Sequence, residues 1–301
     1  MFQTENSVRV QGILSEINIK HGSYMKNGQP METLGGNIKI KTSQVMNGEK
    51  VELDVPIHMF STKYKNDGEI NPAYEAIERI TKEFKSIAAV GEDEADRVGV
   101  FAGSERRKGD AIKMNEYWGA NGQLIAFPRI TSNFITKIAK DSCVPEATFS
   151  MVFYIKSIAP EVDSEGIETG RVKVEGCPVT FGDKVELIPF YSVNEAVGST
   201  IMSRWSVGDT VRATGYLKFA SETINRVEEQ DFGEQTVRSF TRSISELLIS
   251  GGSNPMEGDF ALSKSDIEKG LADRLQRLEV LKTRVNKKAP GKDGSAEDLG
   301  F

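Results

Sequence analysis

Histidine and cysteine are scarce in this 301-residue sequence, which contains only two of each. With so few histidines and cysteines, a catalytic triad or a histidine-based metal site is not expected. Cys143 and Cys177 are far apart and form no C-x-x-C pair, so we expect neither a disulfide framework nor a cysteine-rich zinc site. The sequence also has no glycine-rich phosphate loop. These absences favour a protein that is not an enzyme and has no cofactor.

Long apolar runs are also missing. No stretch of ~18 apolar residues occurs, and the N-terminus lacks the basic-then-apolar order of a signal peptide, so we expect a cytoplasmic protein without a membrane partner. Lys and Arg number 38 against 44 Asp and Glu, a net charge of −6. This balance excludes a protein coated in basic surface, but it is compatible with one local cationic groove.

The sequence contains an internal repeat. Gly36–Leu53 aligns with Gly170–Leu187 at a constant offset of 134 residues without a gap, and eight of the eighteen positions are identical. The matches include Lys39 with Lys173. One deletion then places the segment ending at His58 on the segment ending at Tyr191. We therefore expect two copies of one fold.

Each repeated block has the pattern of a β-hairpin. Ile38 and Ile40 alternate with Lys39 and Lys41, which predicts a strand with one buried and one wet face. Asn47-Gly48 is typical of a two-residue hairpin turn. Helical spacing follows each hairpin, and further strands precede and follow, over the ranges Val8–Ile17, Pro72–Ile87, Asp96–Phe101, Phe149–Ile158, Asn194–Trp205, Asp209–Tyr216 and Val237–Ile249.

This order predicts a mainly β fold of two tandem OB-folds, the five-stranded Greek-key barrel with a helix between its third and fourth strands. The fifth strand of the first copy is either Ile112–Trp118 or Leu124–Ile130. An SH3-like barrel or a β-sandwich shares the hairpins, but neither expects a helix at that point in both copies. The expected boundaries are residues 1–140 and 147–250 for the barrels, 251–286 for a linker and amphipathic helix, and 287–301 for a flexible tail.

The helix of the third segment begins at a capping box, Ser265-Asp266-Ile267-Glu268. Its apolar stripe consists of Ile267, Leu271, Leu275, Leu278, Leu281 and Val285. The stripe spans under three heptads, so packing against its own domain or a partner is favoured over a coiled coil.

Cations and aromatic residues recur on the strand faces predicted to point outward. Phosphates attract positive charge and unstacked bases stack on flat rings, so this combination suits single-stranded nucleic acid. Tyr216, between Arg212 and Lys218 on one strand face, is the clearest aromatic candidate. The candidate residues are Lys39, Lys41, Phe101, Arg106, Arg107, Lys108, Lys113, Tyr117, Trp118 and Arg129 in the first copy, and Arg171, Lys173, Tyr191, Arg212, Tyr216 and Lys218 in the second.

Each candidate also has an ordinary structural interpretation. An exposed lysine on a strand commonly protects an edge, Trp118 is of a type more often found in a core, and a short basic loop such as Arg106-Arg107-Lys108 is common. Recurrence of the lysine at Lys39 and Lys173 favours a shared ligand over these separate explanations.

The last six residues, Ala296 to Phe301, join Glu297 and Asp298 to Leu299 and a terminal Phe301. With the two predicted barrels, this layout resembles single-stranded DNA-binding proteins, of the phage-encoded type more than the bacterial housekeeping type. The resemblance implies that the acidic tip binds replication and recombination partners and competes with DNA for the groove. The tip here has two acids, and its linker carries Lys287, Lys288 and Lys292, unlike the more strongly acidic pattern.

The resulting hypothesis is a single-stranded DNA-binding protein that protects and organises strands in replication or recombination. One alternative is a β-rich adaptor that self-associates through its barrels and C-terminal helix. Another is a nuclease or annealing factor that uses carboxylates such as Asp54, Asp96 and Asp209 as magnesium ligands. Those aspartates are expected at strand starts, where Asp usually makes turns, so this alternative ranks below the others.

Overall fold

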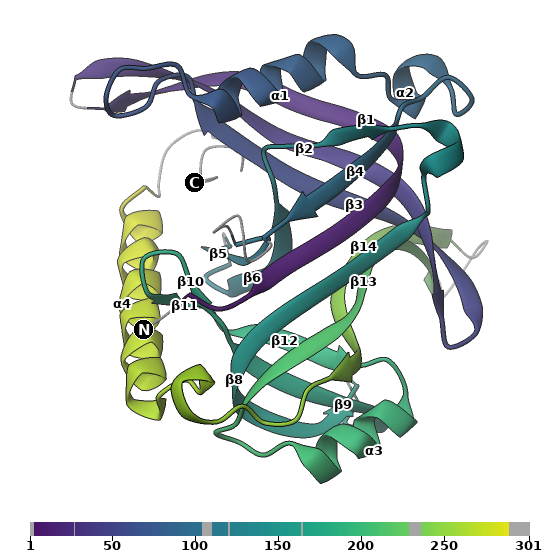
Figure 1. Ribbon diagram of the computed structural model, residues 1–301, viewed down its shortest axis with the longest axis vertical. Helices are drawn as coiled ribbons and strands as arrows, with labels where there is room; N and C mark the ends of the chain where they lie inside the picture. The colour runs from purple at the N-terminus through teal and green to yellow at the C-terminus, as the bar shows by residue number, and fades with distance from the viewer. Residues whose placement is uncertain are drawn as a thin grey trace.

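The computed structural model describes residues 3–26, 28–103, 110–119, 121–163, 165–228 and 236–288. These residues form two OB-fold barrels, one above the other in Figure 1. The first is built from β1 (Asn6–Lys26), β2 (Gln29–Met46), β3 (Glu49–Thr62), β4 (Arg97–Ala102), β5 (Ile112–Trp118), β6 (Leu124–Thr131) and β7 (Thr136–Ile138). Both segments proposed as the fifth strand form strands. β6 takes the position of the fifth strand and pairs in parallel with β3. The position of the fourth strand is divided between β4, which pairs with β1, and β5, which pairs with β6.

The second barrel closes completely. It consists of β8 (Glu146–Val162), β9 (Glu168–Cys177), β12 (Ile188–Ser192), β14 (Thr236–Gly252) and β13 (Thr210–Glu228), with β13 returning to pair with β8. The parallel β12–β14 pair corresponds to the β3–β6 pair of the first barrel. A helix precedes the fourth strand in both copies: α1 (Pro72–Glu83) with the short α2 (Ile87–Val90), and α3 (Glu195–Arg204). In Figure 1 α1 and α3 lie at opposite ends of the molecule.

The first hairpin has the predicted geometry. Asn47 and Gly48 have φ of 53° and 83°, the left-handed pair that a two-residue turn between twisted strands requires. Ile38 and Ile40 are fully buried, while Lys39 and Lys41 on the opposite face are partly exposed. The alternation in the sequence therefore assigned the two faces of β2 correctly.

The second hairpin departs from the aligned register. Lys39 pairs with Pro56, yet Lys173 pairs with Tyr191, two residues beyond the aligned Pro189. An even shift keeps every side chain on its original face. The shift accompanies a separate two-stranded sheet, β10 (Val179–Thr180) with β11 (Lys184–Val185), into which the repeated Lys184-Val185 segment is diverted.

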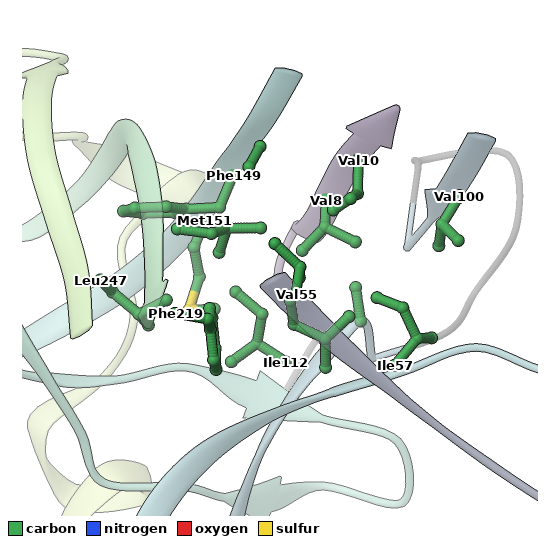
Figure 2. Close-up of a cluster of buried hydrophobic side chains, with 14 of the residues drawn as sticks. Val8, Val10, Val55, Ile57, Val100, Ile112, Phe149, Met151, Phe219 and Leu247 are labelled. Atoms are coloured by element: carbon green, nitrogen blue, oxygen red, sulfur yellow. The ribbon is translucent and has the colours of Figure 1, made fainter. Parts of the chain in front are cut away.

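The two barrels share one core. Asn6 to Gln11 of β1 pair antiparallel with Glu146 to Met151 of β8, so the first strands of the two barrels join their sheets. Buried side chains from both sides of this junction form a single cluster. Figure 2 shows Val8, Val10, Phe149 and Met151 of these strands among residues of β3, β13 and β14. Burial of this extent fixes the barrels relative to each other.

The C-terminal helix α4 (Lys264–Lys288) connects the barrels on one side (Figure 1). Ile267 packs with Val185 and Leu262 in a second, smaller core. Two short 3₁₀ turns lie elsewhere in the chain, at Lys140–Ser142 and Gly258–Phe260. The predicted stripe is only partly covered: Leu278 is buried, whereas Leu275 and Leu281 are 60% and 39% exposed. Within the described ranges, no helix has the length and apolar character that a membrane span needs.

Candidate nucleic-acid interface

A groove of about 940 Å³ lies between the two barrels. It forms where β3 lies against β13 and β6 lies against β14. Its walls carry both polar and aromatic side chains. Strands β2, β3, β5 and β6 of the first barrel form one wall, and β12, β13 and β14 of the second barrel form the other. Among the lining residues are Asn37, His58, Asn115, Phe127, Arg129, Tyr191, Lys218 and Glu246.

Arg129 of β6 is the cation of this groove without an anion. Its Nε is buried and has no hydrogen-bond partner, and none of the carboxylates whose side chains the structure describes forms an ion pair with it, while the side chain as a whole is partly exposed. Burial lowers the pKa of the guanidinium below its ordinary range. Partial desolvation of a charge that has no partner is costly, so an anion that enters the groove and pairs with Arg129 is favoured.

His58 of β3 lies beside this cation. Burial first, and the charge of Arg129 second, lower the pKa of His58 to about 4, so the ring is neutral at pH 7. Its Nδ1 lies 3.2 Å from Oδ1 of Asn37. The groove floor therefore offers a neutral imidazole and an amide next to a free guanidinium, which together can hydrogen-bond a phosphate or a base edge.

Aromatic rings line both walls. Phe127 of β6 meets Tyr117 of β5 edge-on, with ring centroids 6.5 Å apart, and Tyr117 is 37% exposed. On the other wall, Tyr191 of β12 lies under the Arg171 guanidinium, whose Cζ is 5.0 Å from the centroid of the Tyr191 ring. Rings beside cations are the combination that stacks bases while binding the backbone.

The two lysines related by the repeat flank this groove. Lys39 pairs across β2–β3 with Pro56, and Lys173 pairs across β9–β12 with Tyr191, and both of these partners line the groove. Each lysine binds a carboxylate: Lys39 Nζ lies 2.7 Å from Glu16 and Lys173 Nζ 3.7 Å from Glu175. The hydrogen bond to Glu16 raises the pKa of Lys39.

Lys41 lies two residues beyond Lys39 on the same face of β2. Its Nζ is 2.9 Å from Glu92, and this hydrogen bond raises the pKa of Lys41. On the second barrel, Arg171 is bound by Glu161 and Glu246, at 2.6 Å and 2.9 Å, and Lys218 lies 3.7 Å from Glu246. Most of the predicted cations are therefore already paired with acids.

Several predicted residues lie outside the groove lining. Phe101 of β4 is 42% exposed beneath Arg9, Lys113 lies 3.6 Å from Asp110, and Arg212 lies 2.9 Å from Glu5. Asp110 is three residues from Lys113, whereas Glu5 lies far from Arg212 in the chain, and local sequence patterns do not reveal that second pair.

Tyr216 points outward as predicted, and it packs partly against the core. It shares a row with Leu248 and Tyr191 across β13, β14 and β12. The row leads from Tyr216 to the groove wall, so the residue flanks the site rather than lining it.

Trp118 has a structural contact instead of an open face. Its indole Nε1 donates a hydrogen bond of 2.9 Å to the Leu278 carbonyl of α4, and Lys282 Nζ lies 4.6 Å from the ring centroid. This side chain therefore anchors α4 to the first barrel. The remaining predicted residues, Arg106, Arg107, Lys108, Glu297, Asp298, Leu299 and Phe301, lie outside the described residues.

The groove also contains residues that were not among the sequence candidates, namely Asn37, His58, Asn115, Phe127 and Glu246. Two features of the sequence pointed to His58, namely the scarcity of histidine and its alignment with the candidate Tyr191 in the repeat. The pairing of β6 with β3 brings Arg129 and His58 together, and it depends on a long-range contact rather than on a motif.

The fold and the groove define a protein with two OB-folds in one chain and, between them, a groove lined by aromatic and charged side chains. The chain belongs to the YorF family, whose model matches residues 4–284. No curated protein matches it.

Among solved structures, the chain is similar to the wild-type single-stranded DNA binding protein from Thermus aquaticus. The TM-score is 0.52 at 9% identity, over 88% of this chain and 99% of that one. A deletion mutant of the same protein matches with a TM-score of 0.48 at 10% identity, over 86% and 98% of the two chains. At this identity the likeness shows the fold.

Proposed function

We propose that this protein binds single-stranded DNA in the groove between its barrels and thereby protects and organises strands. The observation that carries the proposal is Arg129, a partly buried guanidinium with no acid beside it among the described side chains, in a groove with aromatic rings on both walls. A phosphate supplies the missing anion, and the adjoining rings stack unpaired bases, each worth ~1–3 kcal/mol.

The likeness to the Thermus aquaticus protein supports the same ligand through a shared fold. We further propose a non-enzymatic role in phage DNA replication or recombination in the host cytoplasm. In this role the tail from Glu297 to Phe301 recruits partner proteins.

Titration of fluorescent oligo-dT against a duplex of equal length tests the proposal. We expect single-strand binding that weakens with salt by about 0.7 log units per phosphate contact per log unit of salt. Equal affinity for both ligands, or binding to neither, would reject it.

A further inference from the structure

The Glu246 carboxylate occupies a cationic cluster at the wall of the groove. It comes from β14 and lies between Arg171 of β9 and Lys218 of β13. Arg171 donates from Nη1 to Glu246 Oε2 at 2.9 Å and from Nη2 to Oε1 at 3.3 Å. Lys218 Nζ lies 3.7 Å from the same Oε2. A guanidinium fork and an ammonium therefore converge on one anion.

A second carboxylate holds the same guanidinium from outside the groove lining. Arg171 donates from Nε to Glu161 Oε2 at 2.6 Å and from Nη2 to Oε1 at 2.7 Å, and Thr169 also donates to Oε2 at 2.6 Å. Glu161 therefore has the shorter contacts, while Glu246 lines the groove. Glu161 fixes the position of Arg171, and Glu246 lies between Arg171 and Lys218.

We propose that Arg171 and Lys218 form a phosphodiester subsite, which the Glu246 carboxylate fills when no DNA is bound. This inference rests on the proposed function. A carboxylate and a phosphate accept the same bidentate pair of hydrogen bonds from a guanidinium, so one replaces the other without moving Arg171. Tyr191 lies under that guanidinium and lines the groove beside the subsite.

Displacement of Glu246 has a cost that the strand must meet. The carboxylate loses Arg171 and Lys218 as the phosphate takes its place, and it then takes up a counterion from solution. Part of the counterion release that accompanies phosphate binding is thereby cancelled. A single phosphate ion gains little at this subsite, whereas a strand also bound at Arg129 brings its next phosphates to high local concentration.

The test uses the full chain with Glu246→Gln, which keeps the shape and one acceptor oxygen but removes the charge. Glu161→Gln removes the same charge from the other side of Arg171, and Glu168→Gln removes one from an exposed position of β9. Oligo-dT affinity is measured by fluorescence anisotropy from low to high salt, and thermal unfolding checks the fold of each variant.

We expect Glu246→Gln to bind oligo-dT about three- to tenfold more tightly than the unsubstituted protein, with a salt dependence steeper by up to about 0.7 log units. The control variant Glu168→Gln gains less than twofold. Glu161→Gln, which weakens the contacts that position Arg171, binds no more tightly than the unsubstituted protein. Equal gains for all three variants, or no gain for Glu246→Gln while the unsubstituted protein binds oligo-dT, would overturn the subsite. Failure of the unsubstituted protein to bind oligo-dT would instead reject the proposed function.

Discussion

Arg129 and His58 lie on the adjacent parallel strands β6 and β3, and both line the groove between the barrels. The cation adds to burial in holding the pKa of His58 at about 4, well below the ordinary 6.5. Arg129 thus acts on its neighbour as a charge that no acid of the described residues neutralises.

Acidification should destabilise the fold through His58. The unfolded chain takes up a proton on this ring below pH 6.5, while the folded chain does so only near pH 4. The contribution of neutral His58 to the free energy of unfolding is therefore complete above about pH 6.5 and is lost as the pH drops from 6.5 to 4. Thermal unfolding midpoints of His58→Gln should fall less over this range. His21→Gln, which changes an exposed histidine, should follow the unsubstituted profile. Identical profiles for all three proteins would contradict this cause.

Loss of the Arg129 charge should weaken DNA binding more than it affects folding. Arg129→Gln removes a charge-assisted contact worth ~1.5–3 kcal/mol, so oligo-dT affinity should drop at least tenfold. The salt slope should become shallower by about 0.7. The unfolding temperature should stay equal or rise, because the variant removes a partly desolvated cation that has no partner among the described side chains.

Arg204→Gln, at an exposed position of α3, is the matched control and should leave affinity within twofold. Equal losses in both variants would indicate a general charge effect and not a contact in the groove.

The ring of Tyr191 should contribute base stacking. Tyr191→Leu keeps apolar volume next to the core but removes the ring, and we expect binding weaker by ~1–3 kcal/mol in anisotropy titrations. Tyr64→Leu changes a ring that is 40% exposed outside the groove lining and should have no effect. If Tyr191→Leu binds as tightly as its control, no base stacks there.

The ion pair between Arg274 of α4 and Glu116 of β5 should hold the helix to the first barrel. The two side chains are only 10% and 11% exposed. Removal of one partner from a buried pair costs about 3–5 kcal/mol, so Arg274→Gln should lower the free energy of unfolding by that amount. In a double-mutant cycle with Glu116→Gln, the combined loss should be smaller than the sum of the single losses. Additive losses would show that the pair is not coupled.

Local patterns in the sequence predicted the barrels well. Alternation assigned Ile38 and Ile40 to the core, and Asn47-Gly48 marked the turn. Asn71-Pro72 marked a helix start, where the Asn71 side chain accepts from the Ala73 amide at 3.1 Å. These features depend on backbone sterics and burial over a few residues, which is why the sequence reveals them.

The groove depends on contacts that no local pattern contains. The β1–β8 pairing sets one barrel against the other across more than a hundred residues of chain. The ion pair between Arg212 and Glu5 also joins segments that are more than a hundred residues apart in the chain. A strand pattern shows that Arg129 and Arg171 point outward, but only the tertiary fold decides that the first has no acid in the described chain and the second has two.

Photocrosslinking tests most directly whether a single strand lies between the barrels. Oligo-dT carrying 5-iodouridine would be irradiated with the protein, and the crosslinked peptides mapped by mass spectrometry. Our account predicts crosslinks at the groove rings, Phe127 and Tyr191, and their loss in Arg129→Gln at moderate salt. Crosslinks confined to exposed rings outside the groove, such as Phe101 and Phe181, would contradict it.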